Sequence, residues 1–295
     1  MAFDQLQFLQ TVVFGLIEGS VIAVGAVGLT LSYSVTRFIN FAYGEFLTYG
    51  AYLTVFLAGG LFGISLPLPA AAVAAILIVG AFGVGVSRVF FEPISERGAL
   101  PLLITSIGVS FILRNGLQAW VGVQARQLPV PLMRRTEYFG LVELTDLELS
   151  VVVVSIATML AVHFVLQRTM LGKRMRAISG NRSLAEVAGI DTTRIVRQTW
   201  FISAAAGALS GVLYAVLFSP FRPAVGFEYL IVIFAATLLG GIGRPYGAML
   251  GAVLIWLAMN FGSTYLSANY TRAYAFLILV AVLLVRPEGI RGGEF

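Results

Sequence analysis

The chain alternates between long apolar stretches and short polar breaks along its whole length. Nine stretches are dominated by apolar residues, at about 8–34, 41–62, 66–90, 100–122, 149–167, 198–219, 229–243, 246–262 and 271–286. A hydrocarbon layer about 30 Å thick needs roughly 20 mostly apolar residues in each helix that crosses it. The pattern therefore predicts an all-α fold, a polytopic transmembrane helix bundle of eight or nine membrane segments, some of them short or interrupted.

Composition supports membrane insertion. Of the 295 residues, 59% are hydrophobic and 11% charged, and the mean hydropathy is +0.93. Soluble domains carry about 25% charged residues, so a soluble fold would have a very large core and almost no polar exterior. No Ser- or Pro-rich linker divides the chain, so we expect residues 1–295 to form a single membrane domain. The first stretch lacks a basic flank and a cleavage site, so we expect it to be retained.

One apolar stretch, 229–262, is broken by the glycine-rich run 240–245. It can form two short spans or a re-entrant pair. Irregular backbone at membrane depth must be shielded by protein or line a cavity, because lipid cannot satisfy its N–H and C=O groups. A short echo, Tyr-Gly-Ala-x-Leu at 49–53 and at 246–250, is consistent with paired interrupted segments or with chance.

Loop charges predict the orientation in the membrane. Segment 168–197 holds seven cations and two acids, whereas segment 123–148 holds three cations and four acids. Because cytoplasmic loops are enriched in Lys and Arg, we expect the first segment in the cytoplasm and the second outside. The N-terminal segment carries only Asp4 and leaves its own side open. By alternation the cytoplasmic side also receives Arg37, Arg97, Arg286 and Arg291.

The residues that carry chemistry are few. The chain has no cysteine and one histidine, His163, which we interpret as a polar group facing other helices. An enzyme needs a convergent acid, base, nucleophile or metal set, and no such set is visible. No phosphate loop of the form Gly-x-x-x-x-Gly-Lys-Ser/Thr is present. We therefore expect no catalytic residue, metal or cofactor in this chain, and no nucleic-acid partner, since its net charge of +5 lies in loops.

The cytoplasmic loop contains a short helix signal. Ser183 and Glu186 have the spacing of a capping box, and Gly189 suits a helix stop. The helix between them offers a small apolar face of Leu184, Val187 and Ala188. Such a helix is suited to insertion into a partner's groove, and an ordinary solvated loop is the alternative.

Charged residues within the apolar stretches are the next candidates, because they usually face a partner or water. Two interpretations are open for Asn40, Gly44 and Glu45. They line a path at a break in the helix, or they mark a helix boundary at the inner interface. At such a boundary the negative charge of Glu45 would be favourable near the helix N-terminus. For Glu18 we expect a structural hydrogen bond within the bundle rather than contact with a substrate. Arg114 is expected to extend outward to the membrane surface.

Three motifs occur in the order found in a known family. The stretch 28–52 contains Arg37-Phe-Ile-Asn-Phe-Ala-Tyr-Gly-Glu45, the loop 171–191 carries the short helix, and 239–251 is rich in glycine. Together they resemble the permeases for branched-chain amino acids of ATP-binding-cassette importers, the LivH type. Tyr43 stands where the family pattern leads us to expect a histidine, which argues against a protonatable group there.

The resemblance implies a multi-pass permease subunit in the plasma or inner membrane, carrying branched-chain or related small amino acids. It also implies a second related permease, cytoplasmic ATPase subunits that bind the ATP, and an external substrate-binding protein. A permease for urea or short amides, or an ion-coupled carrier or channel acting alone, remain the alternatives.

The short helix in the cytoplasmic loop, together with the resemblance, and the two polar breaks give two groups of expected site residues. Those expected to couple to the ATPase are Arg176, Ala177, Asn181, Ser183, Leu184, Ala185, Glu186, Gly189, Ile190 and Asp191. Those expected along the translocation path are Asn40, Gly44, Glu45, Gly240, Gly241 and Gly243.

Overall fold

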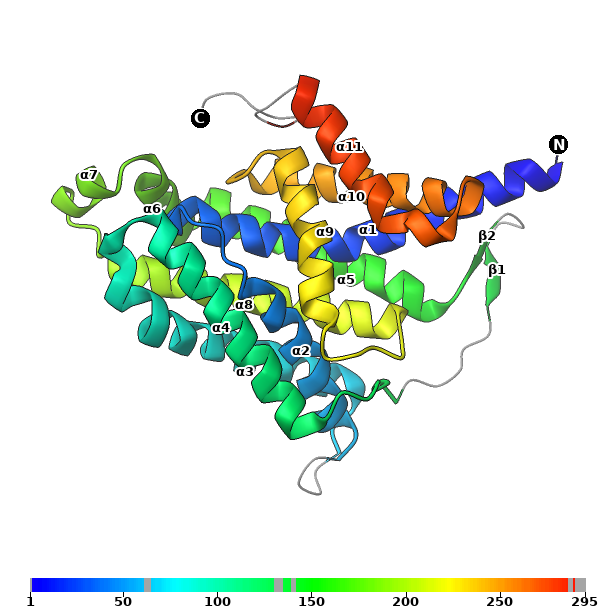
Figure 1. The fold of residues 1–295 in the computed structure, drawn as a ribbon, viewed down its shortest axis with the longest axis horizontal. Coiled ribbons are helices and arrows are strands. Elements are labelled where there is room, and N and C mark those ends of the chain that lie inside the picture. The colour runs from blue at the N-terminus through cyan, green and yellow to red at the C-terminus, as the bar shows by residue number, and fades with distance from the viewer. Residues whose placement is uncertain (1, 61–64, 130–134, 139–141, 286–288, 290–295) are drawn as a thin grey trace.

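The computed structural model describes residues 2–60, 65–129, 135–138, 142–285 and 289, and these are almost entirely helical (Figure 1). The helices of the bundle are α1 (Ala2–Thr36), α2 (Tyr43–Ala58), α3 (Leu68–Val86), α4 (Ala99–Val121), α5 (Asp146–Arg168), α8 (Thr192–Leu217), α9 (Val225–Gly240), α10 (Pro245–Tyr265) and α11 (Thr271–Val285). Short turns of π-helix (Ser87–Phe91) and 3-10 helix (Glu92–Arg97) extend α3, and another 3-10 turn (Ala268–Tyr270) precedes α11.

The predicted bundle is confirmed, because each of the nine apolar stretches forms one helix. Within the described residues, seven helices are long and apolar enough to cross a membrane. The other two, α2 and α9, have 16 residues each, which gives them a length of about 24 Å. The protein is therefore a multi-pass membrane protein with two short helices. The glycine-rich break separates the short helix α9 from α10, which is long enough to cross the membrane.

Helix α1 is the axis of the bundle. It extends along most of the molecule and lies against α8 and α10 (Figure 1). Burial is compared over the most apolar 18-residue part of each helix. There, 72% of α1 and 61% of α8 is buried, compared with 22% for α5 and 11% for α11 with its preceding turn. The outer helices expose large apolar side chains, such as Leu160 at 64% and Leu284 at 81%. A surface of this kind marks contact with lipid or with another membrane protein.

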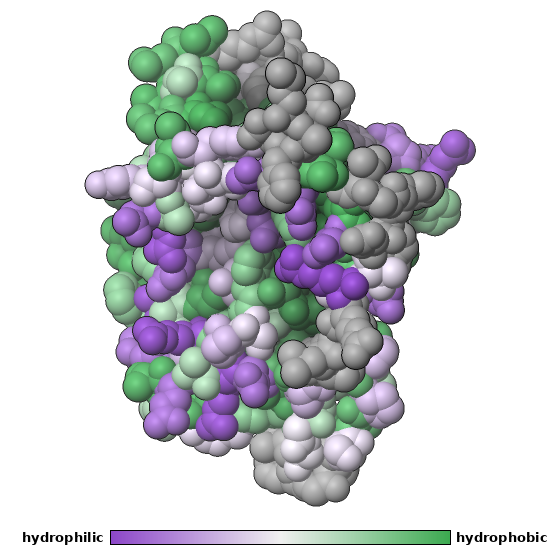
Figure 2. Space-filling model, turned by 90° about the vertical axis from the view of Figure 1, so that its right-hand side faces the viewer, coloured by the Kyte–Doolittle hydropathy of each residue, from purple (hydrophilic) through white to green (hydrophobic). Residues whose placement is uncertain are grey.

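The two ends of the bundle carry different structures. At one, which we call the α7 end, α6 (Met170–Gly180) and α7 (Arg182–Val187) project from the bundle (Figure 1). At the other, the hairpin end, β1 (Thr136–Tyr138) pairs antiparallel with β2 (Val142–Leu144) near the start of α1. Figure 2 faces the hairpin end and shows hydrophilic residues around an apolar centre.

Contacts between segments place the basic residues at the α7 end. Arg37 donates to the Ser179 carbonyl of α6. Arg197 of α8 pairs with Glu92 at 2.7 Å, which fixes the 92–97 turn and thus Arg97 at that end. Arg37 and Arg97 therefore lie on the same side as the 168–197 loop, as alternation predicts. Residues 286 and 291 lie outside the described residues.

Candidate functional site

Helix α2 begins inside the bundle. Its first residue, Tyr43, is fully buried, and its hydroxyl donates to the Gly25 carbonyl of α1 at 2.7 Å. At about 1.5 Å per residue, Gly25 lies roughly 16 Å before the C-terminal end of α1. Gly207, in the interior of α8, approaches the same tyrosine ring. The chain therefore turns back after α1 and starts α2 inside the helix bundle, and the choice between a path-lining break and a helix boundary at the inner interface stays a prediction.

The start of α9 meets the start of α2. Gly44 and Gly226 are each the second residue of their helix, and a Cβ on Gly44 would lie 2.5 Å from the Gly226 carbonyl oxygen. A Cβ on Gly226 would collide with the Gly44 carbonyl in turn. The Gly226 N–H donates to Thr48 Oγ1 at 3.0 Å. Only glycine permits this separation, so both residues are required by a backbone contact.

From this contact the two helices run in opposite directions (Figure 1). Helix α2 extends toward the end of α4, where Phe56 packs on Trp120. Helix α9 extends across α1, and Gly243 in the loop that follows it lies beside Tyr33, near the end of α1. The short interrupted segments are thus α2 and α9, so the echo at 49–53 and 246–250 does not mark equivalent positions. Broken helices that meet at depth are typical of transporter sites.

A buried ion pair fixes the start of α2. Glu45 is fully buried, and its Oε1 accepts from Arg114 Nη2 at 2.8 Å and from Ser110 at 2.8 Å. The Arg114 guanidinium also lies 4.1 Å from the centre of the Phe227 ring on α9. The expected outward extension of Arg114 is therefore wrong. A buried carboxylate without a cation nearby would be too costly, so the arginine turns inward and joins α4 to α2 and α9.

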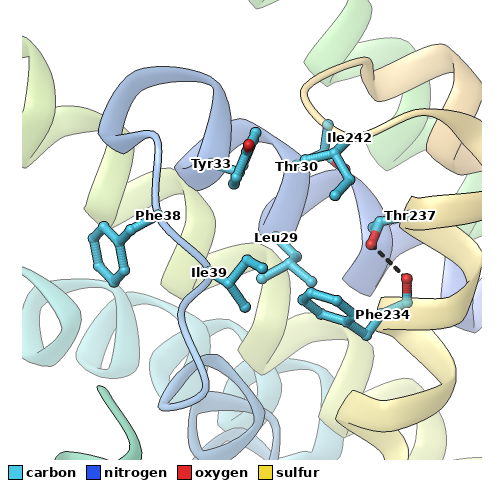
Figure 3. Close-up of a pocket in the computed structure, with 8 residues that line it drawn as sticks. All are labelled: Leu29, Thr30, Tyr33, Phe38, Ile39, Phe234, Thr237 and Ile242. Carbon is cyan, nitrogen blue, oxygen red and sulfur yellow. Dashed lines mark hydrogen bonds between the residues drawn. The ribbon is translucent and has the colours of Figure 1, made fainter. Parts of the chain in front are cut away.

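The two chain breaks meet at a small pocket (Figure 3). Ile39 belongs to the break before α2, and Ile242 belongs to the break after α9. Thr30 and Tyr33 of α1 and Thr237 of α9 contribute hydroxyls, although that of Thr237 donates to the Phe234 carbonyl. The pocket has a volume of about 10 Å³, which is space for at most one water. In this conformation the pocket is closed to an amino acid.

The predicted path residues lie beside this pocket and do not line it. Asn40 is buried, and its side-chain oxygen accepts from the Ala42 N–H at 3.0 Å. Gly241 and Gly243 have φ values of 99° and 86°, a left-handed conformation that favours glycine, and they position Ile242 between them. Gly240 packs against Gly247 of α10. Their role on a path stays a prediction.

Helix α7 is capped differently from the predicted capping box. Asn181 is the N-cap, and its side-chain oxygen accepts from the Leu184 N–H at 3.0 Å. Glu186 instead accepts from Thr192 at 2.8 Å and Arg182 at 3.2 Å. The predicted Ser183–Glu186 capping box is therefore wrong, because Asn181 serves as the N-cap and the helix starts two residues earlier than predicted. The hydrogen bond from Thr192, with that from Arg182, lowers the pKa of the Glu186 carboxyl.

The segment containing α7 has one buried anchor and an exposed face. Ala185 is 4% exposed and belongs to a cluster that includes Ile178 of α6 and Ile195 of α8. In contrast, Leu184 is 66% exposed and Val187 is 87% exposed. Several polar residues expected to couple therefore serve to hold the segment in shape, while its apolar side chains face outward.

The remaining predicted coupling residues surround this helix. Gly189 ends α7 with a φ of 80°. Asp191 caps α8 by accepting from the Arg194 N–H at 2.9 Å, and Arg176 donates to the Leu166 carbonyl. Ile190 is half-buried, and Ala177 and Ser183 are exposed.

Two intramembrane polar groups make hydrogen bonds between helices. Glu18 of α1 accepts from Trp256 and, at 2.6 Å, from Asn260, both on α10, so the expected structural hydrogen bond is confirmed. His163 of α5 bonds through Nδ1 to the Tyr246 hydroxyl of α10 at 2.7 Å, as expected for a polar group that faces another helix. Among the residues with coordinates, no cluster of three metal-ligating side chains is found.

Residues 11–285 match the family described as "Branched-chain amino acid transport system / permease component". The chain belongs to this family. It is 33% identical to the high-affinity branched-chain amino acid transport system permease protein LivH of Escherichia coli strain K12, over 99% of this chain and 98% of that relative. The permease protein BraD of Pseudomonas aeruginosa is also 33% identical, over 97% and 96% of the two chains.

An archaeal relative extends the comparison. A relative from Methanocaldococcus jannaschii, described as "Probable branched-chain amino acid transport permease protein LivH", is 29% identical, over 95% of this chain and 91% of the relative. No solved structure matches. The family resemblance predicted from the three motifs is thus confirmed over nearly the full length of this permease.

Proposed function

We propose that the protein is the permease subunit of an ATP-binding-cassette importer that carries branched-chain or related small amino acids across the plasma or inner membrane. The observation that carries this proposal is the match over 99% of the chain to permeases of branched-chain amino acid transport systems. ATP is hydrolysed by separate subunits, consistent with a sequence that has no phosphate loop.

The exposed face of α7 is the proposed contact with the ATPase. Leu184 and Val187 project from a segment rich in cations, which the charge asymmetry assigns to the cytoplasm. A short apolar helix face fits a partner's groove. Ala185 anchors the segment from beneath, through contacts with α6 and α8. Motion of a bound ATPase would therefore be transmitted to α5 and α8, the helices on either side of α6 and α7.

At the opposite end, the hairpin faces outward and receives a substrate-binding protein. A second, related permease packs alongside in the bilayer, where the outer helices expose apolar surface. In this proposal the closed pocket between the two breaks is the constriction of the path. It opens when α2 and α9 move apart at their N-terminal contact.

The subunit composition tests the proposal directly. The tagged protein is purified from its native membrane in mild detergent, and the bound proteins are identified by mass spectrometry. We expect an ATPase and a second permease. A solitary or purely homo-oligomeric chain that moves substrate along an ion gradient would instead identify an ion-coupled carrier. Uptake of leucine by the reconstituted complex, compared with uptake of urea, identifies the class of cargo.

The contact at α7 has its own test. Leu184→Glu places a charge on the exposed face without touching the buried cluster, so the complex should insert normally. We expect ATP-dependent uptake to fall roughly tenfold or more, as for truncation of an interface hot spot. Thr193→Glu, an exposed position in the first turn of α8, is the matched control and should retain uptake. Equal uptake in the two variants would remove α7 from the interface. Ala185 is unsuitable for this test because it is buried.

A further inference from the structure

A second cavity lies at the hairpin end, away from the closed central pocket. Its volume is about 330 Å³, within the range of small-molecule sites. Its walls come from α1, from the residue preceding β1, from the first turn of α5, and from the ends of α8 and α10. Phe14, Ile17 and Leu217 form its apolar side. The cavity thus has the size of an amino acid and an apolar wall for a side chain.

The first charged group of this cavity is Glu18. It lies within the membrane-spanning part of α1, and it is held by the indole N–H of Trp256 and the side-chain amide of Asn260. Both donors are neutral, so they orient the carboxylate without cancelling its charge. Both hydrogen bonds use Oε2, and Glu18 itself lines the cavity. A carboxylate at this depth is costly unless it meets water or a counter-charge.

Two further charges complete the lining. Glu148, in the first turn of α5, accepts from the Thr145 N–H at 2.7 Å and is fixed by a capping box. Arg135 lines the cavity from the start of β1, with its guanidinium 5.5 Å from the centre of the Phe14 ring. The cavity therefore presents two carboxylates and one guanidinium beside an apolar wall. A simple cation would need only the carboxylates, and a simple anion would need only the guanidinium. An uncharged amide would need no charged group in the cavity.

We propose that this cavity binds the zwitterionic head of an α-amino acid, with its ammonium on Glu18 and Glu148 and its carboxylate on Arg135. The aliphatic side chain of the substrate lies against Phe14, Ile17 and Leu217. This inference rests on the proposed import of amino acids and specifies its first binding site within the permease. It also specifies the substrate class, since urea and neutral short amides lack both charges.

The test is leucine binding to the complex purified from native membrane and placed in nanodiscs, with no external binding protein added. Glu18→Gln should weaken the binding of radiolabelled leucine about tenfold to hundredfold, the effect of losing a hydrogen bond between charged groups. Glu143→Gln removes a carboxylate from β2, outside the cavity, and is the matched control with unchanged affinity. Binding of 4-methylpentanoate, which lacks the ammonium group, should be no weaker in Glu18→Gln than in the natural sequence.

Size-exclusion chromatography shows whether Glu18→Gln assembles. If it does not, Arg135→Gln carries the same test, because Arg135 is exposed and its replacement disturbs no buried contact. Its matched control is Arg126→Gln, at an exposed position outside the cavity. Weaker leucine binding in Arg135→Gln alone supports the site. Equal binding in the cavity variants and their controls overturns it.

Uptake by the unmodified complex separates the two proposals. If that complex takes up leucine with ATP and Glu18→Gln binds leucine normally, the cavity is not the substrate site and the importer proposal stands. If the unmodified complex takes up no amino acid, the importer proposal fails, and the inference fails with it. Trp256 emission gives an independent signal, since a ligand on Glu18 changes its indole hydrogen bond. Leucine should shift this emission in Glu143→Gln but not in Glu18→Gln.

Discussion

At the scale of single residues, polar side chains that are isolated in the sequence form pairs in the structure. Glu45 and Arg114 are far apart in sequence, and each alone would be too costly within the bilayer. Together they form a hydrogen-bonded ion pair with Ser110 on one side and Phe227 on the other. The pair connects the start of α2 to α4 and to the first turn of α9. It therefore stabilises the contact between the two short helices.

Removing one partner should be far worse than removing both. Arg114→Leu leaves Glu45 buried without a counter-charge, and we expect a loss of about 3–5 kcal/mol of stability. The loss is measured as a lower melting temperature of the purified protein in detergent. The double variant Glu45→Leu with Arg114→Leu should recover most of that stability.

The neighbouring position provides the control for this pair. Asn115 is exposed on the same helix, and its side chain donates only to the Phe111 carbonyl of α4. Asn115→Leu should change the melting temperature little. A double variant that is no more stable than Arg114→Leu would contradict the assignment of a buried pair.

At the scale of elements, α2 and α9 are related by their positions. Each is 16 residues long, each starts after a chain break, and each has glycine as its second residue. Their N-terminal ends meet at Gly44 and Gly226 and leave no room for side chains. This close contact brings the positive ends of two helix dipoles together inside the bundle, next to the carboxylate of Glu45.

The glycine contact can be tested with a single methyl group. Gly44→Ala should force α2 and α9 apart and cost about 1–3 kcal/mol, the usual effect of overpacking. Gly108→Ala in α4 is the matched control, because a Cβ there meets nothing within 4 Å. It should be neutral, or stabilising by up to about 1 kcal/mol through helix propensity. Equal melting temperatures of the two variants would show that the helices do not meet as described.

At the scale of the whole molecule, the proposed ATPase contact and the proposed amino-acid cavity lie at opposite ends of the bundle. The α7 end carries the exposed apolar helix and most of the cations. The hairpin end carries the start of α1 and the charged cavity. Because α1 connects these ends along the bundle, the α7 end and the hairpin end face opposite sides. If the charge rule holds, the N-terminus lies outside the cell.

This orientation can be measured because the chain has no cysteine. Single variants Thr136→Cys, in the hairpin, and Ser183→Cys, in α7, are treated with a membrane-impermeant maleimide on intact cells. We expect Cys labelling at position 136 before permeabilisation and at position 183 only afterwards. The reverse result would put α7 outside and would exclude it as an ATPase contact.

The sequence by itself determined where the nine apolar helices lie, although it left the number of membrane segments at eight or nine and did not predict α6. Length and apolar character are local properties, and lipid requires each crossing segment to satisfy its own backbone. The cationic loop, the helix stop at Gly189 and the family motifs were equally visible, because each depends on residues close together in the chain. The capping of α7 was not correctly predicted, since Asn and Ser are both favoured N-cap residues and the sequence pattern alone did not show that Asn181, two residues before Ser183, is the one that accepts from a helix N–H.

The tertiary structure alone decided which polar residues meet. Arg114 turns inward only because Glu45 lies opposite it on another helix. Position 226 requires glycine only because the backbone of Gly44 lies against it. The cavity at the hairpin end joins Glu18, Arg135 and Glu148 from three separate segments. Contacts of this kind depend on helix order and tilt in three dimensions. Periodicity and loop charge do not encode those quantities, because they describe each segment alone.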